Sequence, residues 1–244
     1  MATNSIVELH EVTRRFGAVA AVDRLSLDVR QGEILGFLGT NGAGKTTTIK
    51  LMLGFARPDE GTVNVLGGAP ERPATRRRIG YMPETAHYYP YLDIHELLRF
   101  YGGLCGLDAA TIRARAARLI ERVGLADAGR RLLRHYSKGM LQRAGIAQAL
   151  LHDPDLLILD EPLTGLDPLA RIQFRDLLLE LRSEGKTIFF SSHELSEAEL
   201  ICDRVAILKQ GAQVWCGALR DVAGDGRQNL ERIFLKHLAG EVAP

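Results

Sequence analysis

The sequence predicts an α/β fold with a mostly parallel core sheet, an N-terminal antiparallel β subdomain and an inserted helical subdomain. Near the N-terminus, apolar and polar residues alternate, as in half-buried antiparallel strands. Farther on, short and continuously apolar runs alternate with helical segments, which is typical of parallel strands buried on both faces. Between residues 88 and 151 strand-like runs are absent and helical patterns dominate. These residues are therefore expected to form a helical insertion between strands.

The β segments are expected in a definite order along the chain. Residues 5–29 contain the antiparallel strands, and a doubly buried strand at 34–38 feeds a glycine-rich turn and a helix at 46–53. We expect further strands of the largely parallel sheet at residues 62–66, 79–82, 156–159 and 187–190. A helix at 168–184 is expected between the last two of these strands.

The helical insertion, residues 88–151, is expected to hold three helices, at 95–101, at 109–123 after the cap Asp108, and at 140–151. Its arginines lie mostly off the apolar stripe of the helix at 109–123, which favours a solvated face over a partner-binding one.

The C-terminal part, residues 204–244, is expected to form a hairpin and then a tail helix at 229–238. Residues 223–228 form the predicted linker within this part. We treat residues 1–244 as a single domain that contains the insertion.

Composition excludes several classes of protein. The chain has 244 residues, of which 46% are hydrophobic and 25% charged, so it is neither collagen-like nor disordered. Cys105, Cys202 and Cys216 share no metal-ligand spacing, so we expect reduced thiols. The net charge of +1 argues against nucleic acid as the main partner. Without a leader pattern or a long apolar run, the chain is expected to be neither secreted nor membrane-spanning.

A glycine-rich motif of the form G-x-x-x-x-G-K-T follows the buried strand at 34–38. With the next threonine it comprises Gly39, Thr40, Asn41, Gly42, Ala43, Gly44, Lys45, Thr46 and Thr47. Its glycines let backbone N–H groups turn toward phosphates, while Lys45 reaches phosphate oxygens and the Thr46 hydroxyl can ligate Mg²⁺. The motif predicts that the chain binds a nucleoside triphosphate with Mg²⁺.

Two adjacent carboxylates end the strand at 156–159, at the edge where open α/β sheets bind ligands. Neighbouring strand residues point to opposite faces, so Asp160 and Glu161 should have different roles. Asp160 suits the Mg²⁺ shell that Thr46 shares, and Glu161 suits orienting or deprotonating the attacking water. The pair predicts a hydrolase rather than a passive binder.

Two further polar segments are weak signals in isolation. Ser137 and Gly139 precede the helix at 140–151, where the N-terminus offers a second anion site or an ordinary serine cap. His193 follows the strand at 187–190, where an imidazole can donate to a phosphate oxygen. A lone histidine is more often structural, so the position after a strand end is what favours a functional role.

The order and spacing of these motifs resemble the ATP-binding-cassette (ABC) ATPases over nearly the whole chain. The resemblance implies a P-loop NTPase fold, with a Walker A loop at residues 39–46 and the Walker B aspartate and catalytic glutamate at Asp160 and Glu161. It implies further that Phe16 stacks on adenine, that Leu166 and Asp167 form the D-loop beside the nucleotide, and that His193 senses the γ-phosphate.

The chain departs from the family pattern at two places. The family signature usually reads Leu-Ser-Gly-Gly-Gln, of which this chain keeps Ser137 and Gly139. The family's switch glutamine corresponds to Glu84, which adds a carboxylate near the expected Mg²⁺ and makes Glu84 a candidate for both catalysis and metal binding. Both variants, and the tail at 230–235, resemble exporter-type subunits.

The resemblance implies an ATP-hydrolysing subunit that powers export through a separate membrane permease. It further implies a head-to-tail dimer of two copies, with ATP and Mg²⁺, peripheral on the cytoplasmic side of the cell membrane. Aromatic residues between 84 and 99, among them Tyr88, Tyr89 and Tyr91, suit either contact with the permease or core packing.

Two alternatives to the transporter subunit differ in function. One is a soluble ABC-type ATPase that acts on ribosomes or DNA, which a single motif set without a heptad run disfavours. The other is a nucleotide-gated regulatory module without turnover, which an intact Glu161 and His193 disfavour.

Overall fold

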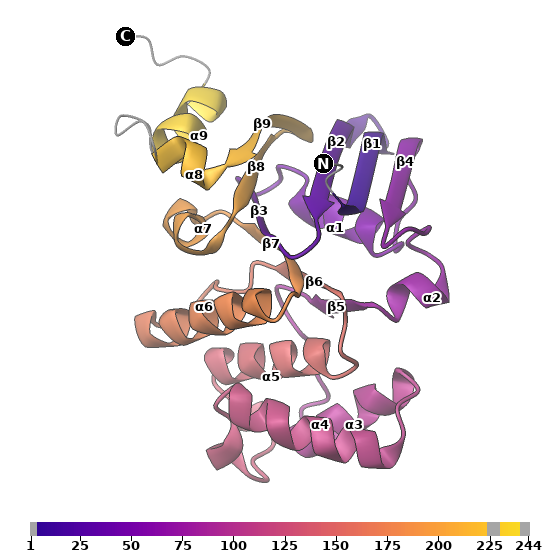
Figure 1. Ribbon diagram of the computed structural model, residues 1–244, viewed down its shortest axis with the longest axis vertical. Coiled ribbons are helices and arrows are strands. Elements are labelled where there is room, and N and C mark those ends of the chain that lie inside the picture. The colour runs from indigo at the N-terminus through magenta and orange to yellow at the C-terminus, as the bar shows by residue number, and fades with distance from the viewer. Residues whose placement is uncertain (1–3, 224–229, 240–244) are drawn as a thin grey trace.

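The computed structural model describes residues 4–223 and 230–239. Two sheets and a group of helices make up this part of the chain (Figure 1). The strands are β1 Ser5–Phe16, β2 Val19–Arg30, β3 Ile34–Gly39, β4 Glu60–Val65, β5 Ile79–Met82, β6 Leu156–Asp160, β7 Thr187–Ser192, β8 Arg204–Lys209 and β9 Ala212–Ala218. The α-helices are α1 Lys45–Met52, α2 Pro73–Arg76, α3 Ile94–Leu104, α4 Ala109–Arg122, α5 Lys138–Leu150, α6 Pro168–Ser183, α7 Leu195–Ile201, α8 Leu219–Ala223 and α9 Leu230–Ala239.

The core sheet has the strand order β5-β6-β7-β3-β8-β9. Its first five strands are parallel and β9 is antiparallel to β8, which confirms the mostly parallel core. Every residue of β3, β6 and β7 is buried, as continuous apolar runs require. Because β7 lies between β6 and β3, the carboxyl ends of these strands meet at one edge of the sheet.

The second sheet, in the order β2-β1-β4, is antiparallel and confirms the expected N-terminal β subdomain. One assignment was wrong: the run at residues 62–66 belongs here and not to the parallel sheet, since Val7 pairs with Val65 in antiparallel register. The physical reason is burial, because β4 is exposed over its first half and fully buried only at Val65. Such a strand fits the edge of a half-buried sheet.

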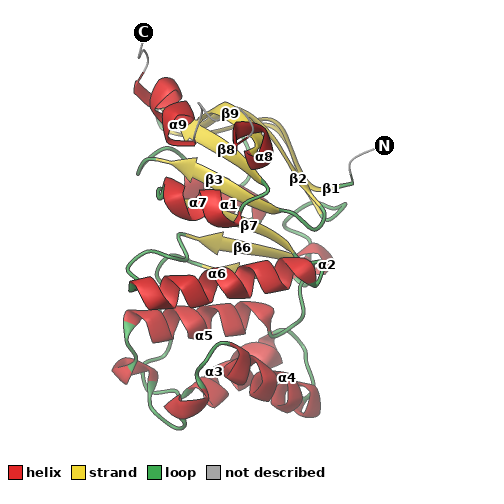
Figure 2. Cartoon of the chain, turned by 60° about the vertical axis from the view of Figure 1, so that its left-hand side comes forward, coloured by secondary structure: helices red, strands yellow, loops and turns green. Residues whose placement is uncertain are grey.

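Helices α3, α4 and α5 lie between β5 and β6 in the chain and form the lower part of Figure 1. Figure 2 shows α5 running beside α6, with α3 and α4 farther from the core sheet. The Asp93 side chain and Glu96 form a reciprocal capping box at the start of α3. The predicted cap Asp108 accepts bonds from the backbone N–H groups of Ala110 and Thr111.

The C-terminal hairpin pairs β8 with β9, as expected. Ala223 ends α8, whereas residues 224–228 of the predicted linker lie outside the described residues, as does Asn229 of the predicted tail helix. Leu230 and Ile233 of α9 are buried in the core. Three short helices, α2, α7 and α8, were not predicted. None of the described helices has both the length and the apolar character needed to cross a bilayer.

Candidate nucleotide-binding and catalytic site

The glycine-rich loop joins the end of β3 to the start of α1. Gly42 and Gly44 have φ angles of 81° and 108°, a region that L side chains rarely adopt. A Cβ atom on Gly44 would lie 2.3 Å from the Ala21 carbonyl oxygen, so only glycine fits there. The buried Lys45 ammonium donates to the Gly39 carbonyl at 2.7 Å and to the Thr40 carbonyl at 3.4 Å. The loop therefore curls around this charge.

Asp160 ends β6 beside the start of α1. Its Oδ2 atom accepts a hydrogen bond from the Thr46 hydroxyl at 3.3 Å, and its Oδ1 atom accepts one from the Ser191 hydroxyl at 2.6 Å. Burial and the nearby charge of Asp160 raise the pKa of Tyr81 to about 12, so this phenol stays protonated beside the site.

Hydroxyl and carboxylate oxygens are the ligands that Mg²⁺ prefers, and this ion usually keeps phosphate oxygens and waters as its other ligands. Thr46 and Asp160 present such oxygens at one point, so these residues fit a magnesium ion. In the part of the chain that the structure describes, no group of three His, Cys, Asp or Glu side chains could hold a metal by itself.

Glu161 follows directly in the chain and faces other partners. Its backbone has a φ of 48°, which turns the chain sharply away from the strand. Its buried carboxylate lies 3.1 Å from Lys45 Nζ, 2.9 Å from His193 Nδ1 and 3.3 Å from the Thr164 hydroxyl. The two adjacent carboxylates thus have separate partners, because the chain turns between them.

Ser137 and Gly139 lie at the start of α5, outside this cluster. The Ser137 hydroxyl caps the helix by accepting from the Met140 N–H at 3.2 Å. Asp167 caps α6 in the same manner, accepting from the Ala170 N–H at 2.9 Å. Gln142 of α5 donates to the Thr164 carbonyl at 3.0 Å and so joins α5 to the loop that follows Glu161.

Two predicted site residues lie at the surface. Phe16, at the end of β1, is 54% exposed, and the Arg14 guanidinium stacks over its ring at 5.0 Å. Glu84 follows β5, is exposed, and makes no side-chain hydrogen bond or ion pair with residues 4–223 or 230–239. Adenine stacking by Phe16, and catalysis and metal binding by Glu84, therefore stay predictions.

The structure thus brings together five of the predicted side chains, namely Lys45, Thr46, Asp160, Glu161 and His193. Sequence reasoning missed Ser191, whose hydroxyl donates to Asp160 and accepts from the Glu161 N–H at 3.0 Å. The available signal was its position at the end of β7, two residues before His193.

Comparison with known proteins shows the family to which the chain belongs. The family model described as "ABC transporter" matches residues 22–164. An uncharacterized ABC transporter ATP-binding protein of Nostoc sp. is 49% identical over 208 residues, which are 84% of this chain and 62% of the relative. The Nod factor export ATP-binding protein I of Cupriavidus pinatubonensis is 39% identical over 91% of this chain and 69% of its own length.

Among solved structures, an ATP-binding subunit of an ABC transporter superposes with a TM-score of 0.86 at 32% identity, covering 95% of this chain and 99% of that one. The chain thus spans a little under two thirds of the length of the Nostoc relative but nearly all of this solved subunit. The fold, the clustered motif residues and these matches together show that the chain belongs to the ABC transporter family of ATP-binding proteins.

Proposed function

We propose that the chain is the ATP-hydrolysing subunit of an ABC exporter. The observation that carries this proposal is the buried Glu161 carboxylate, held between Lys45 and His193 at the edge of the sheet that bears the phosphate loop. A passive nucleotide binder has no need of a carboxylate in that position. The export direction is supported by the similarity to the Nod factor export protein.

In the proposed reaction, the loop N–H groups and Lys45 bind the β- and γ-phosphates of ATP. Thr46 and Asp160 would hold Mg²⁺, which supplies positive charge against the charge that develops on the phosphates. Glu161 takes a proton from the attacking water as the new O–P bond forms and the bond to the β-phosphate oxygen breaks. His193 Nδ1 lies 2.9 Å from the Glu161 carboxylate, which orients the ring so that Nε2 can contact a γ-phosphate oxygen.

We propose two partners for this subunit. The start of α5, with Ser137 and Gly139, lies apart from the phosphate loop of its own chain, and a second copy packed head to tail would supply the phosphate that it binds. The other partner is a separate membrane permease, which places the chain at the cytoplasmic side of the membrane.

An exposed aromatic cluster supports the permease contact. The Tyr89 ring packs against the rings of Tyr91 and Phe100, and these three side chains are 48%, 62% and 41% exposed, in that order. Tyr88 instead packs against the core and stacks edge-on against Tyr101, which matches the core-packing alternative for this residue. Exposed aromatic side chains are enriched at protein interfaces.

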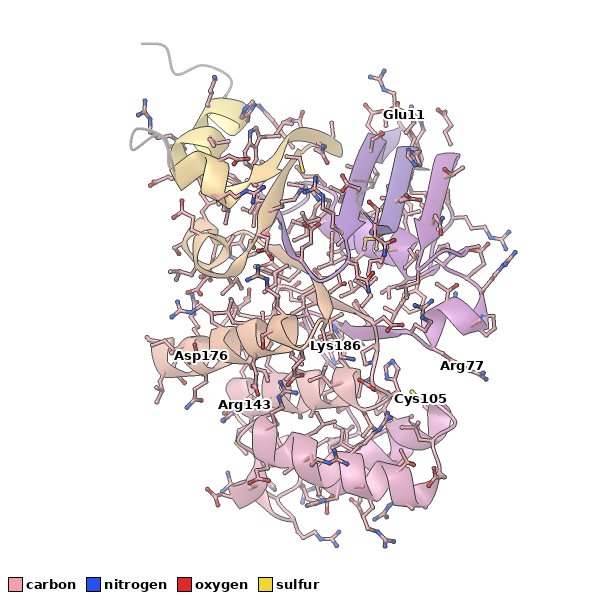
Figure 3. All side chains as sticks on the ribbon, viewed as in Figure 1. Glu11, Arg77, Cys105, Arg143, Asp176 and Lys186 are labelled. Atoms are coloured by element: carbon pink, nitrogen blue, oxygen red, sulfur yellow. The ribbon has the colours of Figure 1, made fainter. Side chains whose placement is uncertain are left out.

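Phosphate release from the purified protein with Mg²⁺ and ATP tests the proposal. We predict that Glu161→Gln abolishes turnover and retains bound ATP, because the amide keeps the shape but cannot accept the proton. Glu11→Gln, on β1 away from the site, is the matched control (Figure 3). Turnover by Glu161→Gln within a few-fold of wild type would remove Glu161 from this role, and a wild type that binds ATP without releasing phosphate would indicate a regulatory module.

A further inference from the structure

Arg171, on α6, joins the two loops that flank the catalytic cluster. Its Nε atom donates to the Leu166 carbonyl at 3.1 Å. Its two terminal nitrogens form a bidentate pair with the Glu194 carboxylate, in which Nη2 donates to Oε1 at 3.0 Å and Nη1 donates to Oε2. Leu166 belongs to the loop between Glu161 and α6, and Glu194 follows His193 directly. One guanidinium therefore contacts both loops.

The Glu194 carboxylate is committed to this pair. Glu194 occupies the N-cap position of α7, yet its side chain makes no capping bond there. Its own N–H donates to the Ser192 hydroxyl at 2.9 Å, so the residue is fixed through both backbone and side chain. Arg171 and Glu194 are each about a quarter exposed, at 26% and 25%. The pair is therefore partly shielded from water, which strengthens it relative to a surface ion pair.

The contacts continue from this pair to the reacting groups. His193, next to Glu194 in the chain, bonds to the Glu161 carboxylate at 2.9 Å, and Glu161 is 3.1 Å from Lys45. On the other side, the Leu166 carbonyl lies next to Asp167, the exposed residue that begins α6. A shift of either loop would therefore move His193 relative to Glu161.

The geometry suits arginine and no other cation. A guanidinium carries five N–H donors in a rigid plane, and three of its nitrogens are used here in fixed directions. A lysine ammonium carries the same charge, but it cannot form the bidentate pair and reach the Leu166 carbonyl in the same arrangement.

We propose that Arg171 is a positioning residue for ATP hydrolysis, which holds the Leu166–Asp167 loop and the His193–Glu194 loop in one arrangement so that His193 meets Glu161. Arg171 itself touches neither the phosphate loop nor Asp160. This inference rests on the proposed ATPase function. It goes beyond that function, because it gives a positioning role to a residue that belongs to none of the motifs described above.

The test compares Arg171→Met with Arg175→Met. Arg175 lies one turn farther along α6 and ion-pairs at 3.5 Å with Glu197, which Arg171 also reaches at 3.8 Å. Its loss therefore removes a similar half-buried charge from the same group of side chains but no contact with either loop. We expect Arg171→Met to lower kcat about 10- to 100-fold, since small misplacements of reacting groups have effects of this size. The KM for ATP should stay within about two-fold, because the phosphate loop and Lys45 are untouched. Arg175→Met should keep the wild-type kcat.

A second variant keeps the test decisive if Arg171→Met does not fold. Glu194→Gln preserves the shape of the side chain and should also lower kcat without changing KM, and the double variant should be no slower than the slower single one. Arg171→Lys should fall short of wild type. Wild-type kcat in both Arg171→Met and Glu194→Gln, or an equal loss in Arg175→Met, would overturn the inference. Absence of phosphate release from the wild type would instead overturn the proposed function itself.

Discussion

Ser191 shows how one buried hydroxyl can hold both Asp160 and Glu161, the two acids that we propose for Mg²⁺ binding and catalysis. It is fully buried at the end of β7, donates to Asp160 and accepts from the backbone of Glu161. The hydrogen bond to Asp160 fixes the carboxylate that would hold Mg²⁺. The bond from Glu161 supports a backbone that stands at a φ of 48°. Partners of metal ligands commonly tune metal affinity in this way.

We predict that Ser191→Ala raises the Mg²⁺ concentration needed for phosphate release, or lowers the maximal rate, by about 10- to 100-fold. A magnesium titration of the purified variant measures both quantities. Thr187→Val is the control, because it removes a buried hydroxyl that bonds Gly32 at the opposite end of the same strand. An unchanged magnesium dependence in Ser191→Ala would show that Asp160 does not need this partner.

For Phe16, we predict that the alanine variant binds nucleotide about 5- to 100-fold more weakly, since stacking on a base is worth ~1–3 kcal/mol. The loss should be the same for ATP and GTP, because every base offers a π-face. Phe55→Ala is a matched control, since Phe55 is also exposed and also lies under an arginine, Arg76, at 5.7 Å. Unchanged affinity in a folded Phe16→Ala variant would exclude stacking at this position.

Among the elements, the start of α5 combines two properties that substitutions can separate. The helix begins at Lys138 and is capped by the Ser137 hydroxyl. The same N-terminus is expected to face the nucleotide of a second copy. Aspartate is as good a cap as serine, but its charge repels phosphate, whereas alanine lacks the cap.

We predict that Ser137→Ala lowers the free energy of unfolding by about 0.5–2 kcal/mol. Ser137→Asp should keep wild-type stability but lose the ability to trap ATP in a closed dimer. Denaturant titration and ATP retention on a desalting column measure the two properties. Asp108→Ala, which removes the cap of α4, should lose stability without losing trapping. A Ser137→Asp protein that traps ATP normally would exclude this helix start from phosphate binding.

Local sequence patterns predicted those elements whose conformation depends on residues close to one another in the chain. The path from β3 through the phosphate loop to α1 follows from a doubly buried strand, two glycines at positive φ and Lys45. The sheet to which β4 belongs does not follow, because its pairing with β1 bridges distant segments and its Thr-Val-Asn-Val run fits either sheet.

Side chains that meet across long sequence distances also escaped prediction. The Arg171–Glu194 pair and the Ser191–Asp160 bond join residues 23 and 31 positions apart, and no periodicity marks them. Helix α7 has seven residues and no side-chain cap, so the usual start signal is missing.

At the scale of the whole molecule, we propose that the complete site has two halves, one from each of two copies. Lys45, Asp160, Glu161 and His193 form the first half. We propose that the start of α5 forms the second half, in which case a two-fold axis would give each ATP one half from each copy.

We predict that mixing Lys45→Ala with Ser137→Asp protein restores ATP trapping at one of the two sites of each mixed dimer, by two-fold symmetry. Because random exchange of equal amounts makes about half of the dimers mixed, trapping should return at about a quarter of all sites. Each variant alone should damage both sites of its own homodimer. In the mixed dimer, one site carries both lesions and the other carries none. Subunit exchange is verified with two labels before the trapped ATP is counted. Exchange without recovered trapping would show that the start of α5 does not act on the partner's nucleotide.

The core sheet separates two hydrophobic clusters, and alternate residues of β3 belong to different ones. Ile34 and Leu38 pack in the cluster that includes Leu97 and other residues of the helical insertion. Leu35 and Phe37 pack in the cluster that contains the antiparallel sheet. Residues without shared contacts combine their mutational effects additively. Non-additive effects between substitutions should therefore be confined to pairs on the same side of the sheet. Two related proteins can then change the packing of the helical insertion and of the antiparallel sheet independently, and recombination between their genes can still exchange these two parts.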